Sequence, residues 1–254
     1  MSPRLLRPKA TGVPVRVGLE MYLNAKYGIT LNGSNVSEWR DLSGNGRHAN
    51  QDTGLNQPAY SANGWTNRPS VDFTRGSSHF LEFTPFALTT QTAFFVIEPT
   101  EAVGSNESQT ILNNITSAAG TFNRWAFVNV PGYKTYSAAL GAAVSGNVAS
   151  VGADIFAQAK MLISHTYNNS GSTTVGNHGI RKDRAAATVE SSSPFFGSSG
   201  LASGRIACRS PGTSGTNDEF ISARYAMILL YNRVLSTAEI AAVENWAVSE
   251  YPLT

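Results

Sequence analysis

The stretch VSEWRDLSGNGRHA, residues 36–49, carries more structural information than any other part of the chain. Asp41 precedes a run of turn-forming residues, and its carboxylate can accept hydrogen bonds from the backbone of the turn that follows. Gly44 and Gly46 allow the positive φ angles that such a turn requires. Trp39 is large and mainly apolar, so we expect it in the core. The stretch therefore predicts a turn organised by Asp41 beside a buried tryptophan.

A second informative stretch, LYNRVLSTAEI, occupies residues 230–240. Ser236 and Glu239 have the spacing of a capping box, in which the serine hydroxyl bonds the amide three residues on and the glutamate reaches back. Apolar residues then recur at helical spacing, and Pro252 ends the pattern. We therefore predict a helix that packs on its own domain. Arg233 stands where the preceding strand turns toward this helix, and it could bind a carboxylate there.

Between these stretches, short apolar segments alternate with turn residues, which is typical of many short strands. Residues 93–97 are apolar on both faces, so we expect a central strand there. The segment 137–150 is either a weak strand pair or a long loop, and the Ser-rich segment 191–203 is predicted to be loop. Further strands are predicted at residues 71–73, 81–83, 125–128, 161–167, 205–208 and 225–231. The whole pattern predicts an antiparallel β-sandwich with one short C-terminal helix.

The two stretches also resemble a known family. Residues 39–49 match the W-x-D-x-S-G-N-x-x-H-A signature of laminin-G-like, concanavalin A-like lectin/glucanase jelly rolls. Residues 230–240 match that family's I-Y-N-R-x-L-S-x-x-E-I run almost throughout. The resemblance implies an all-β concanavalin A-like jelly roll, and we expect a single domain over residues 17–254. It says little about function, because this fold hosts lectins, hydrolases and inert spacers.

Composition excludes several classes of protein. The chain has 254 residues and a net charge of +2, which is too balanced for a protein that binds nucleic acid through its phosphates. Cys208 is the only cysteine, so neither an intrachain disulfide nor a cysteine-based zinc site can form. No apolar run approaches the roughly 18 residues of a membrane-spanning helix, so we expect no membrane insertion. The N-terminus has no signal-peptide pattern.

Residues 1–16 differ from the rest of the chain, because they combine basic residues and three prolines with no acidic residue. The prolines disfavour a helix. We therefore expect an extended basic arm, which is either a frayed terminus or a docking segment that becomes ordered on a partner. The candidate docking residues of this arm are Arg4, Arg7, Lys9 and Arg16.

The sequence gives no support for catalysis. Glucanases of the family that the chain resembles place carboxylates in an E-x-D-x-x-E pattern on one strand, and this pattern is absent. The nearest acidic pairs are Asp218 with Glu219 and Glu98 with Glu101. Adjacent residues of a strand point to opposite faces, and the second pair straddles a proline. His165 lies on an apolar strand face, so we expect a core histidine. We therefore expect a protein that is not an enzyme.

Three functions remain open. In the first, the chain is a virion structural protein, either a capsid decoration or a tail-associated protein, because it resembles stand-alone jelly-roll proteins of tailed phages. Its arm would then dock on other virion proteins, its domain would face outward, and it would assemble as a homo-oligomer in the particle. In the second, it is a carbohydrate-binding module, and in the third, it is an adhesion module of a cellular protein. We favour the first, with binding of host-surface glycans as an added role.

The second function is a carbohydrate-binding module. Sugar sites combine aromatic platforms with polar hydrogen-bonding side chains. Candidate glycan-binding residues in or near polar loops are Trp65, Tyr60, Arg68 and His79. The alternative for Trp65 is that its ring fills the space under its own loop.

A calcium site has little support in the sequence. Members of the broader superfamily hold calcium with Asp and Asn side chains near such turns, and hard cations favour several oxygens from more than one carboxylate. Here Asp41 and Asp72 are the only carboxylates in or beside the matched N-terminal motifs. Met227 stands where relatives often carry an acidic residue. We therefore predict no metal and no cofactor.

Overall fold

The computed structural model describes residues 12–104, 107–115, 121–130, 133–142, 147–151, 158–168, 178–186, 188–190, 203–209 and 218–254. Antiparallel strands dominate, and one helix, α1 (Thr237–Glu250), lies at the C-terminal end, which confirms the predicted fold class. The strands are β1 (Leu19–Asn24), β2 (Ile29–Asn32), β3 (Asn35–Trp39), β4 (Ala49–Asn50), β5 (Ala59–Trp65), β6 (Arg68–Phe73), β7 (Leu81–Phe83), β8 (Gln91–Pro99), β9 (Glu107–Ile115), β10 (Thr121–Val130), β11 (Tyr133–Ala142), β12 (Asn147–Val151), β13 (Met161–Tyr167), β14 (His178–Lys182), β15 (Ala185–Ala186), β16 (Thr188–Glu190), β17 (Ser203–Ile206) and β18 (Ala223–Tyr231).

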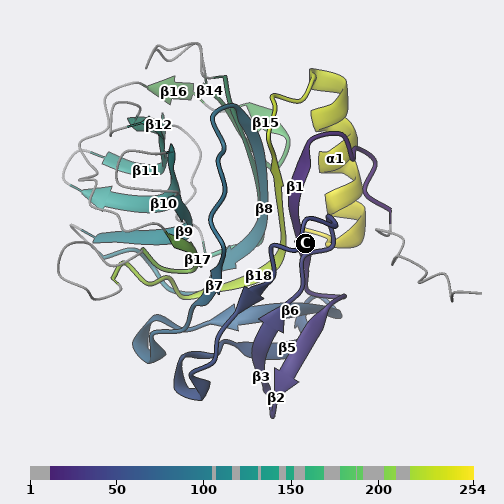
Figure 1. Ribbon diagram of the computed structural model, residues 1–254. Helices are drawn as coiled ribbons and strands as arrows, with labels where there is room; N and C mark the ends of the chain where they lie inside the picture. The colour runs from purple at the N-terminus through teal and green to yellow at the C-terminus, as the bar shows by residue number, and fades with distance from the viewer. Residues whose placement is uncertain are drawn as a thin grey trace, which may run out of the picture.

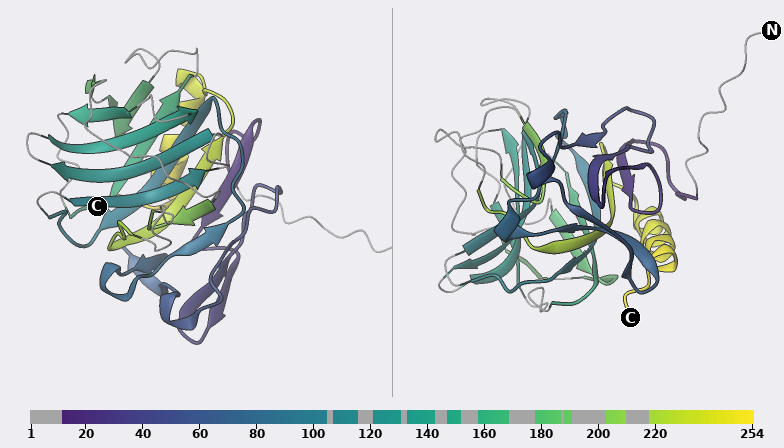
Figure 2. Two further views of the ribbon diagram at one scale, coloured as in Figure 1. Left: turned by 60° about the vertical axis from the view of Figure 1, so that its left-hand side comes forward. Right: turned by 90° about the horizontal axis from the view of Figure 1, so that it is seen from below.

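The strands form two packed layers and a smaller extension (Figures 1 and 2). The back sheet has the order β15–β14–β13–β8–β18–β1. The front sheet has the order β7–β17–β9–β10–β11–β12–β16. The lower sheet, β2–β3–β5–β6, joins the back sheet where β6 pairs with β18. Helix α1 covers the outer face of the back sheet.

Strand β8 lies between two hydrophobic clusters. Phe95 faces the front sheet, where its ring centroid is 5.4 Å from that of Trp125. Phe94 faces the opposite way, 6.0 Å from Tyr231, in the cluster that α1 completes with Val243. This arrangement confirms the central strand predicted from its two apolar faces. Each such side chain contributes about 1.5–3 kcal/mol when fully buried, so the two clusters hold the front sheet, the back sheet and α1 together.

The loop after β3 covers the open edge of β1. Strand β1 pairs with β18 on one side, and on the other side Leu42 N donates to Tyr22 O at 2.8 Å. Asp41 is 4% exposed and accepts hydrogen bonds from Tyr22 N and Ser43 N, both at 2.9 Å. It also accepts from Ser43 Oγ at 2.7 Å and Arg47 N at 3.0 Å. The predicted turn is confirmed, and its Asp41 shields a strand edge that would otherwise be free to pair with another chain.

Glu20, in β1, connects the two signature stretches. Its carboxylate accepts hydrogen bonds from Arg47 Nη2 at 2.5 Å and from Asn232 Nδ2 at 2.6 Å. Asn45 Nδ2 donates to the Glu20 carbonyl at 3.0 Å. Residues from both stretches therefore meet on one strand. This explains physically why two segments far apart in sequence carry the signature of one fold.

The corner before α1 has the predicted contacts. Ser236 and Glu239 form the capping box, since each side chain bonds the backbone of the other residue. Arg233 binds Glu239 with both terminal nitrogens, at 3.0 and 2.6 Å. The guanidinium and the backbone of Ser236 lower the pKa of Glu239 to about 2. The carboxylate predicted for Arg233 is thus the one that also caps the helix.

Residues 12–16, the described end of the predicted arm, pack beside α1. Val13 is buried with 5% of its surface exposed, and Val15 O accepts a hydrogen bond from Tyr231 Oη at 3.0 Å. Arg16 is exposed. These residues therefore belong to the folded body even though the sequence groups them with the arm. Outside the described residues lie Arg4, Arg7 and Lys9.

The segment that the sequence left open, residues 137–150, falls on β11 and β12. These strands pair antiparallel, from Tyr136 with Ser150 to Ala139 with Asn147. The strand-pair alternative is therefore the correct one. The predicted loop at 191–203 lies outside the described residues, apart from Ser203 at the start of β17.

Candidate functional site

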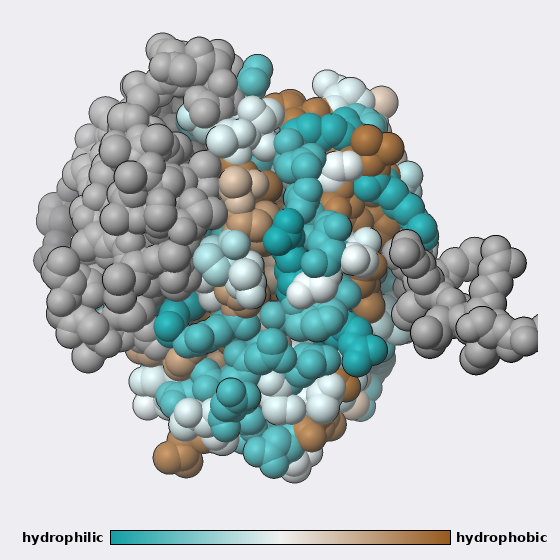
Figure 3. Space-filling view, in the orientation of Figure 1, coloured by the Kyte–Doolittle hydropathy of each residue, from teal (hydrophilic) through white to brown (hydrophobic). Residues whose placement is uncertain are grey.

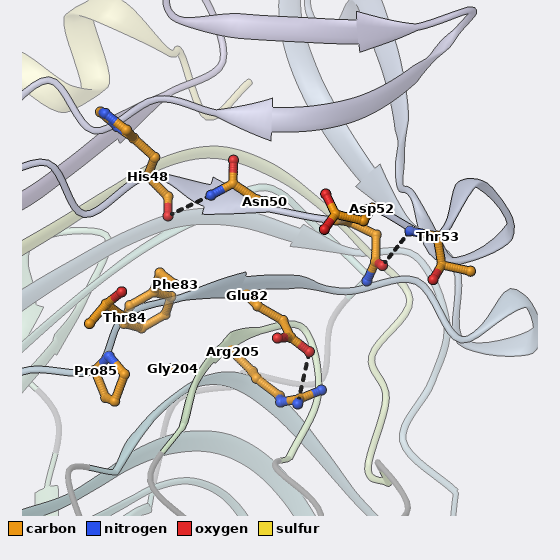
Figure 4. A pocket seen from close by; sticks show the side chains of 11 residues that line it. His48, Asn50, Asp52, Thr53, Glu82, Phe83, Thr84, Pro85, Gly204 and Arg205 are labelled. Atoms are coloured by element: carbon orange, nitrogen blue, oxygen red, sulfur yellow. Dashed lines mark hydrogen bonds and ion pairs between the residues drawn. The ribbon is translucent and has the colours of Figure 1, made fainter.

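A groove of about 610 Å³ opens between β4 on one side and β7 and β17 on the other (Figure 4). Strands β4 and β7 meet at a single pair, Asn50 with Glu82. Because pairing stops there, the chain beyond β4 diverges from β7 and leaves an open polar channel. The lining residues are His48, Asn50, Gln51, Asp52, Thr53, Glu82, Phe83, Thr84, Pro85, Gly204 and Arg205.

The floor of the groove depends on the close approach of β7 and β17. Gly204 pairs with Phe83, and a Cβ at Gly204 would lie only 2.5 Å from the Phe83 ring. Only glycine therefore allows the two strands to pair here. The Phe83 ring itself is 5% exposed, so it supports the floor and offers little surface to a ligand.

The polar side of the groove is organised by hydrogen bonds in the segments on both sides of β4. Gln51 accepts from Thr53 N at 3.0 Å through its side-chain oxygen, and its Nε2 donates to Phe80 O at 3.3 Å. His48 Nδ1 accepts from Asp41 N at 3.0 Å, so the neutral ring carries its proton on Nε2. Asn50 and Asp52 are exposed. These hydrogen bonds therefore fix the backbone around β4, while the Asp52 carboxylate and the Asn50 amide remain exposed to solvent.

Arg205 supplies the fixed cation of the groove. Its Nη2 lies 2.8 Å from Glu82 Oε1, and its guanidinium carbon lies 4.9 Å from the centre of the Phe80 ring. Only 13% of the Arg205 side chain is exposed, against 52% for Glu82. Figure 4 shows the Glu82 carboxylate pointing toward Arg205. The cation is therefore paired and stacked, while part of the carboxylate still faces solvent.

The groove continues into a polar row across the outer face of the front sheet. Register places Arg205 beside Asn113 and Asn113 beside Arg124. Their chain neighbours Leu112 and Trp125 lie in the core between the sheets, so the row faces away from that core. Asn113 and Arg124 are 0% and 1% exposed. The row is therefore accessible to a ligand only at its groove end.

The buried end of the row contains one of the acidic pairs considered from sequence. Glu219 forms an ion pair with Arg124 and lies 3.3 Å from Arg209, and Asp218 Oδ1 accepts from Arg209 Nε at 2.6 Å. In the other pair, Glu98 binds Arg224 at 2.9 Å. These carboxylates are held by arginines in structural contacts.

Trp65 is fully buried, in the cluster beneath α1. Its Nε1 donates to Pro252 O at 2.8 Å, and its ring meets Tyr251 edge to face at 6.1 Å. A ring in this position has no free face for a sugar. The structure therefore favours the alternative in which Trp65 fills the space beneath its own segment of chain.

The other three candidate glycan-binding residues lie on the lower sheet and its neighbouring turn. Tyr60 is half-buried against the core between the sheets, and Arg68 is exposed opposite Trp65 in the β5–β6 hairpin. His79 is half-buried, its Nδ1 accepts from Thr74 N at 3.2 Å, and burial lowers its pKa. None of them lines the groove, and their role in glycan binding stays a prediction.

His165 is a core histidine, as the sequence predicts. It is fully buried, and its Nδ1 accepts from Trp125 Nε1 at 3.0 Å. Its Nε2 lies 3.2 Å from Nδ1 of His178. Burial lowers the pKa of His165 far below its usual value and that of His178 to about 4. Both imidazoles are neutral at neutral pH.

The carboxylates considered for calcium are occupied by protein donors. Asp41 has four hydrogen bonds within its loop. Asp72 Oδ1 accepts from Ser70 Oγ at 2.5 Å, and burial raises the pKa of Asp72. The described parts of the chain contain no group of three or more His, Cys, Asp or Glu side chains placed to hold a metal ion.

As far as the structure describes the chain, it contains no helix with the length and hydropathy needed to cross a membrane.

Reasoning from sequence did not identify the residues that line the groove, because they come from separate segments of the chain. His48 and Asn50 directly follow the signature turn, whereas Glu82 and Arg205 come from strands that the sequence predicts but does not place side by side. Their meeting depends on the pairing of β7 with both β4 and β17. Long-range strand pairing of this kind leaves no local pattern.

Comparison with known proteins gives likeness in fold alone. No family model and no curated protein matches the sequence. Among solved structures, a Trypanosoma rangeli sialidase in complex with the inhibitor DANA has a TM-score of 0.55 at 15% identity, over 92% of this chain and 33% of that chain. The binding domain of Paraclostridial Mosquitocidal Protein 1 has a TM-score of 0.55 at 11% identity, over 90% and 52%.

The binding domain of Botulinum Neurotoxin DC in complex with SialylT has a TM-score of 0.57 at 10% identity, over 91% of this chain and 52% of that chain. This chain thus spans about a third to a half of the length of these proteins. The common part is an all-β sandwich, and one of these neighbours is a binding domain in complex with SialylT. The comparisons therefore show a β-sandwich fold.

Proposed function

We propose that this chain is a non-enzymatic carbohydrate-binding domain and that the saccharide lies in the groove between β4, β7 and β17. The groove itself is the observation that carries the proposal: a channel of about 610 Å³ with exposed amide and carboxylate groups on a rigid sheet edge. Such groups can share hydrogen bonds with sugar hydroxyls. A structural neighbour in complex with SialylT supports it. Because no exposed aromatic ring lines the groove, we expect binding that depends on hydrogen bonds.

A glycan array followed by NMR titration of the best ligand tests this proposal. Replacing Asp52 by alanine removes an exposed acceptor in the groove, so we expect the Kd to rise about tenfold, which corresponds to one hydrogen bond of a charged group. Arg68→Ala tests the alternative site predicted from sequence, because Arg68 is exposed and lies outside the groove. Loss of binding in Arg68→Ala with no change in Asp52→Ala would move the site to the residues predicted from sequence.

Arginine-held carboxylates support the proposal that the domain does not catalyse hydrolysis. A glycosidase needs two carboxyl groups on either side of the scissile bond. In the groove, Glu82 is paired with Arg205, which leaves Asp52 as the one carboxylate without an ion pair among the lining residues. Release of reducing sugar from an array-positive glycan, abolished in Asp52→Asn, would contradict a binding role.

We also propose that the domain is carried on a virus particle and docked there by its basic N-terminal segment. The basic charge of residues 1–16 and the resemblance to phage jelly rolls support this proposal. Residues 12–15 lie beside α1, on the outer side of the back sheet, whereas β7 and β17 belong to the front sheet (Figure 1). Docking through the arm would therefore leave the groove open.

Quantitative mass spectrometry of purified particles tests the virion proposal. Deleting residues 2–11 removes three basic residues and keeps Val13, which is part of a hydrophobic cluster. We expect the number of copies per particle to fall at least tenfold while the thermal stability of the free protein is unchanged. Undiminished incorporation would reject docking through the arm, and complete absence of the full chain from particles would favour a cellular adhesion module.

A further inference from the structure

We propose that the groove selects neutral saccharides and that Asp52 and Glu82 exclude carboxylated ones. This inference rests on the proposed function and deepens it, because it names the class of glycan that the same site takes. It also separates this chain from the neighbour in complex with SialylT, with which it shares only the fold. The charges of the groove and the state of its one arginine carry the inference.

The groove has an excess of negative charge. Of its lining residues, Asp52 and Glu82 are acidic and Arg205 is the one Lys or Arg. Figure 3 shows mainly hydrophilic residues over the lower part of the described surface, where β5, β6 and β7 lie. A carboxylated sugar entering the groove would therefore approach an exposed carboxylate in Asp52 and a half-exposed one in Glu82. Like charges at such distances repel each other.

Arg205 is not free to bind the carboxylate of an acidic sugar. Its guanidinium is paired with Glu82 at 2.8 Å, stacked over Phe80 at 4.9 Å and only 13% exposed. Recruiting it would break the ion pair and leave Glu82 facing both the ligand and solvent. Sites for carboxylates use an arginine whose planar fork is open to two parallel hydrogen bonds. In this groove one terminal nitrogen of the fork is already paired with Glu82.

The undescribed segments after residue 104 do not supply a cation that could reverse this charge. By sequence, they contain one charged residue, Asp154, and no lysine or arginine. The acidic excess is therefore a property of the described residues that line the groove.

The test compares matched pairs of glycans by titration, for example N-acetyllactosamine and its sialylated form. The quantity measured is the selectivity ratio, the Kd of the sialylated glycan divided by that of the neutral one. We expect a ratio of about ten or more at low salt, and a smaller ratio in about 1 M NaCl, where the Debye length falls to about 3 Å. A calcium-containing series shows whether a bound cation changes the ratio.

Charge-removing variants locate the origin of the ratio. Asp52→Asn keeps the shape and polarity of the side chain and removes one charge, so we expect the ratio to fall about threefold, as for one charge about 7 Å away in water. Glu101→Gln is the control, since Glu101 is exposed, lies outside the groove and changes the net charge equally. It should leave the ratio unchanged.

The outcomes distinguish the inference from the function on which it rests. A ratio near one, or tighter binding of the sialylated glycan, would overturn the charge selectivity and leave the carbohydrate-binding proposal standing. Equal changes in Asp52→Asn and Glu101→Gln would also overturn it, because the effect would then come from net charge alone. No binding of either class across the array would reject the proposed function and this inference together.

Discussion

Replacing Asp41 by alanine is expected to lower the free energy of unfolding by about 4 kcal/mol, because it leaves buried donors without an acceptor. The carboxylate accepts from Tyr22 N, Ser43 N, Ser43 Oγ and Arg47 N, at distances between 2.7 and 3.0 Å. Each backbone N–H that remains buried and unpaired costs about 1–3 kcal/mol, although water entering the space offsets part of the sum. Urea unfolding followed by tryptophan fluorescence measures the change.

Removing the Asp41 carboxylate should also expose the edge of β1, in addition to lowering the free energy of unfolding. Tyr22 belongs to β1, so the carboxylate holds the signature loop over the open edge of that strand. Without it, β1 exposes backbone groups that can pair with another chain. We therefore expect Asp41→Ala to aggregate faster than an equally destabilised core variant, measured by light scattering at matched folded fraction.

Asp52→Ala is the control for Asp41→Ala. It removes the same side chain from the neighbouring loop, but Asp52 is exposed. Surface substitutions of this kind change the free energy of unfolding by about 0.5 kcal/mol or less. If the two variants differ by less than about 1 kcal/mol, the hydrogen bonds of Asp41 are not what stabilises the loop, and its role as the organiser of the signature stretch is wrong.

The fold could be predicted from sequence where a local pattern has one physical cause. Ser236 and Glu239 predict a helix start because their spacing is set by the geometry of the first helical turn alone. Residues 93–97 predict a central strand because no surface strand is apolar on both faces. Asp41 and the glycines around it predict a turn for similar local reasons.

The site could not be predicted in the same way, because it arises from pairing between distant strands. Asn50 meets Glu82, and Glu82 meets Arg205, across separations in sequence that no periodicity reports. Trp65 illustrates the converse error. Its polar neighbours in sequence suggest a surface loop, yet contact with the chain near Pro252 buries its ring. Whether an aromatic side chain is a platform or a part of the core depends on segments far away in the chain.

Acidification below pH 6.5 is expected to destabilise the protein through His165 and His178 already above pH 5, where most carboxylates do not yet titrate. Trp125 Nε1 can only donate, so Nδ1 of His165 must accept and Nε2 carries the proton toward His178. Protonating His165 would place an N–H against the Trp125 N–H, and protonating His178 at Nδ1 would place one against His165. The paired, neutral state is therefore the one that the fold accommodates.

The sign of the effect follows from the lowered pKa values. In the unfolded chain both imidazoles bind protons below about pH 6.5, whereas in the folded protein burial lowers the pKa of His178 to about 4 and that of His165 well below its usual value. Over this window the unfolded state holds more protons, so stability is full above pH 6.5 and falls as the pH falls. Each group contributes a slope of about 1.4 kcal/mol per pH unit, and His178 alone accounts for about 3 kcal/mol.

Urea unfolding between pH 7 and 4, with the imidazole state followed by NMR, measures this loss. His178→Gln removes one titrating group and keeps a polar side chain, so the slope between pH 6 and 4.5 should fall by about half, even though the variant is less stable at pH 7. An unchanged slope in His178→Gln would place the acid sensitivity elsewhere. Protonation of either ring above pH 6 in the folded protein would contradict the neutral pair directly. A charged imidazole would place two N–H donors against each other in the hydrogen bonds that join Trp125, His165 and His178.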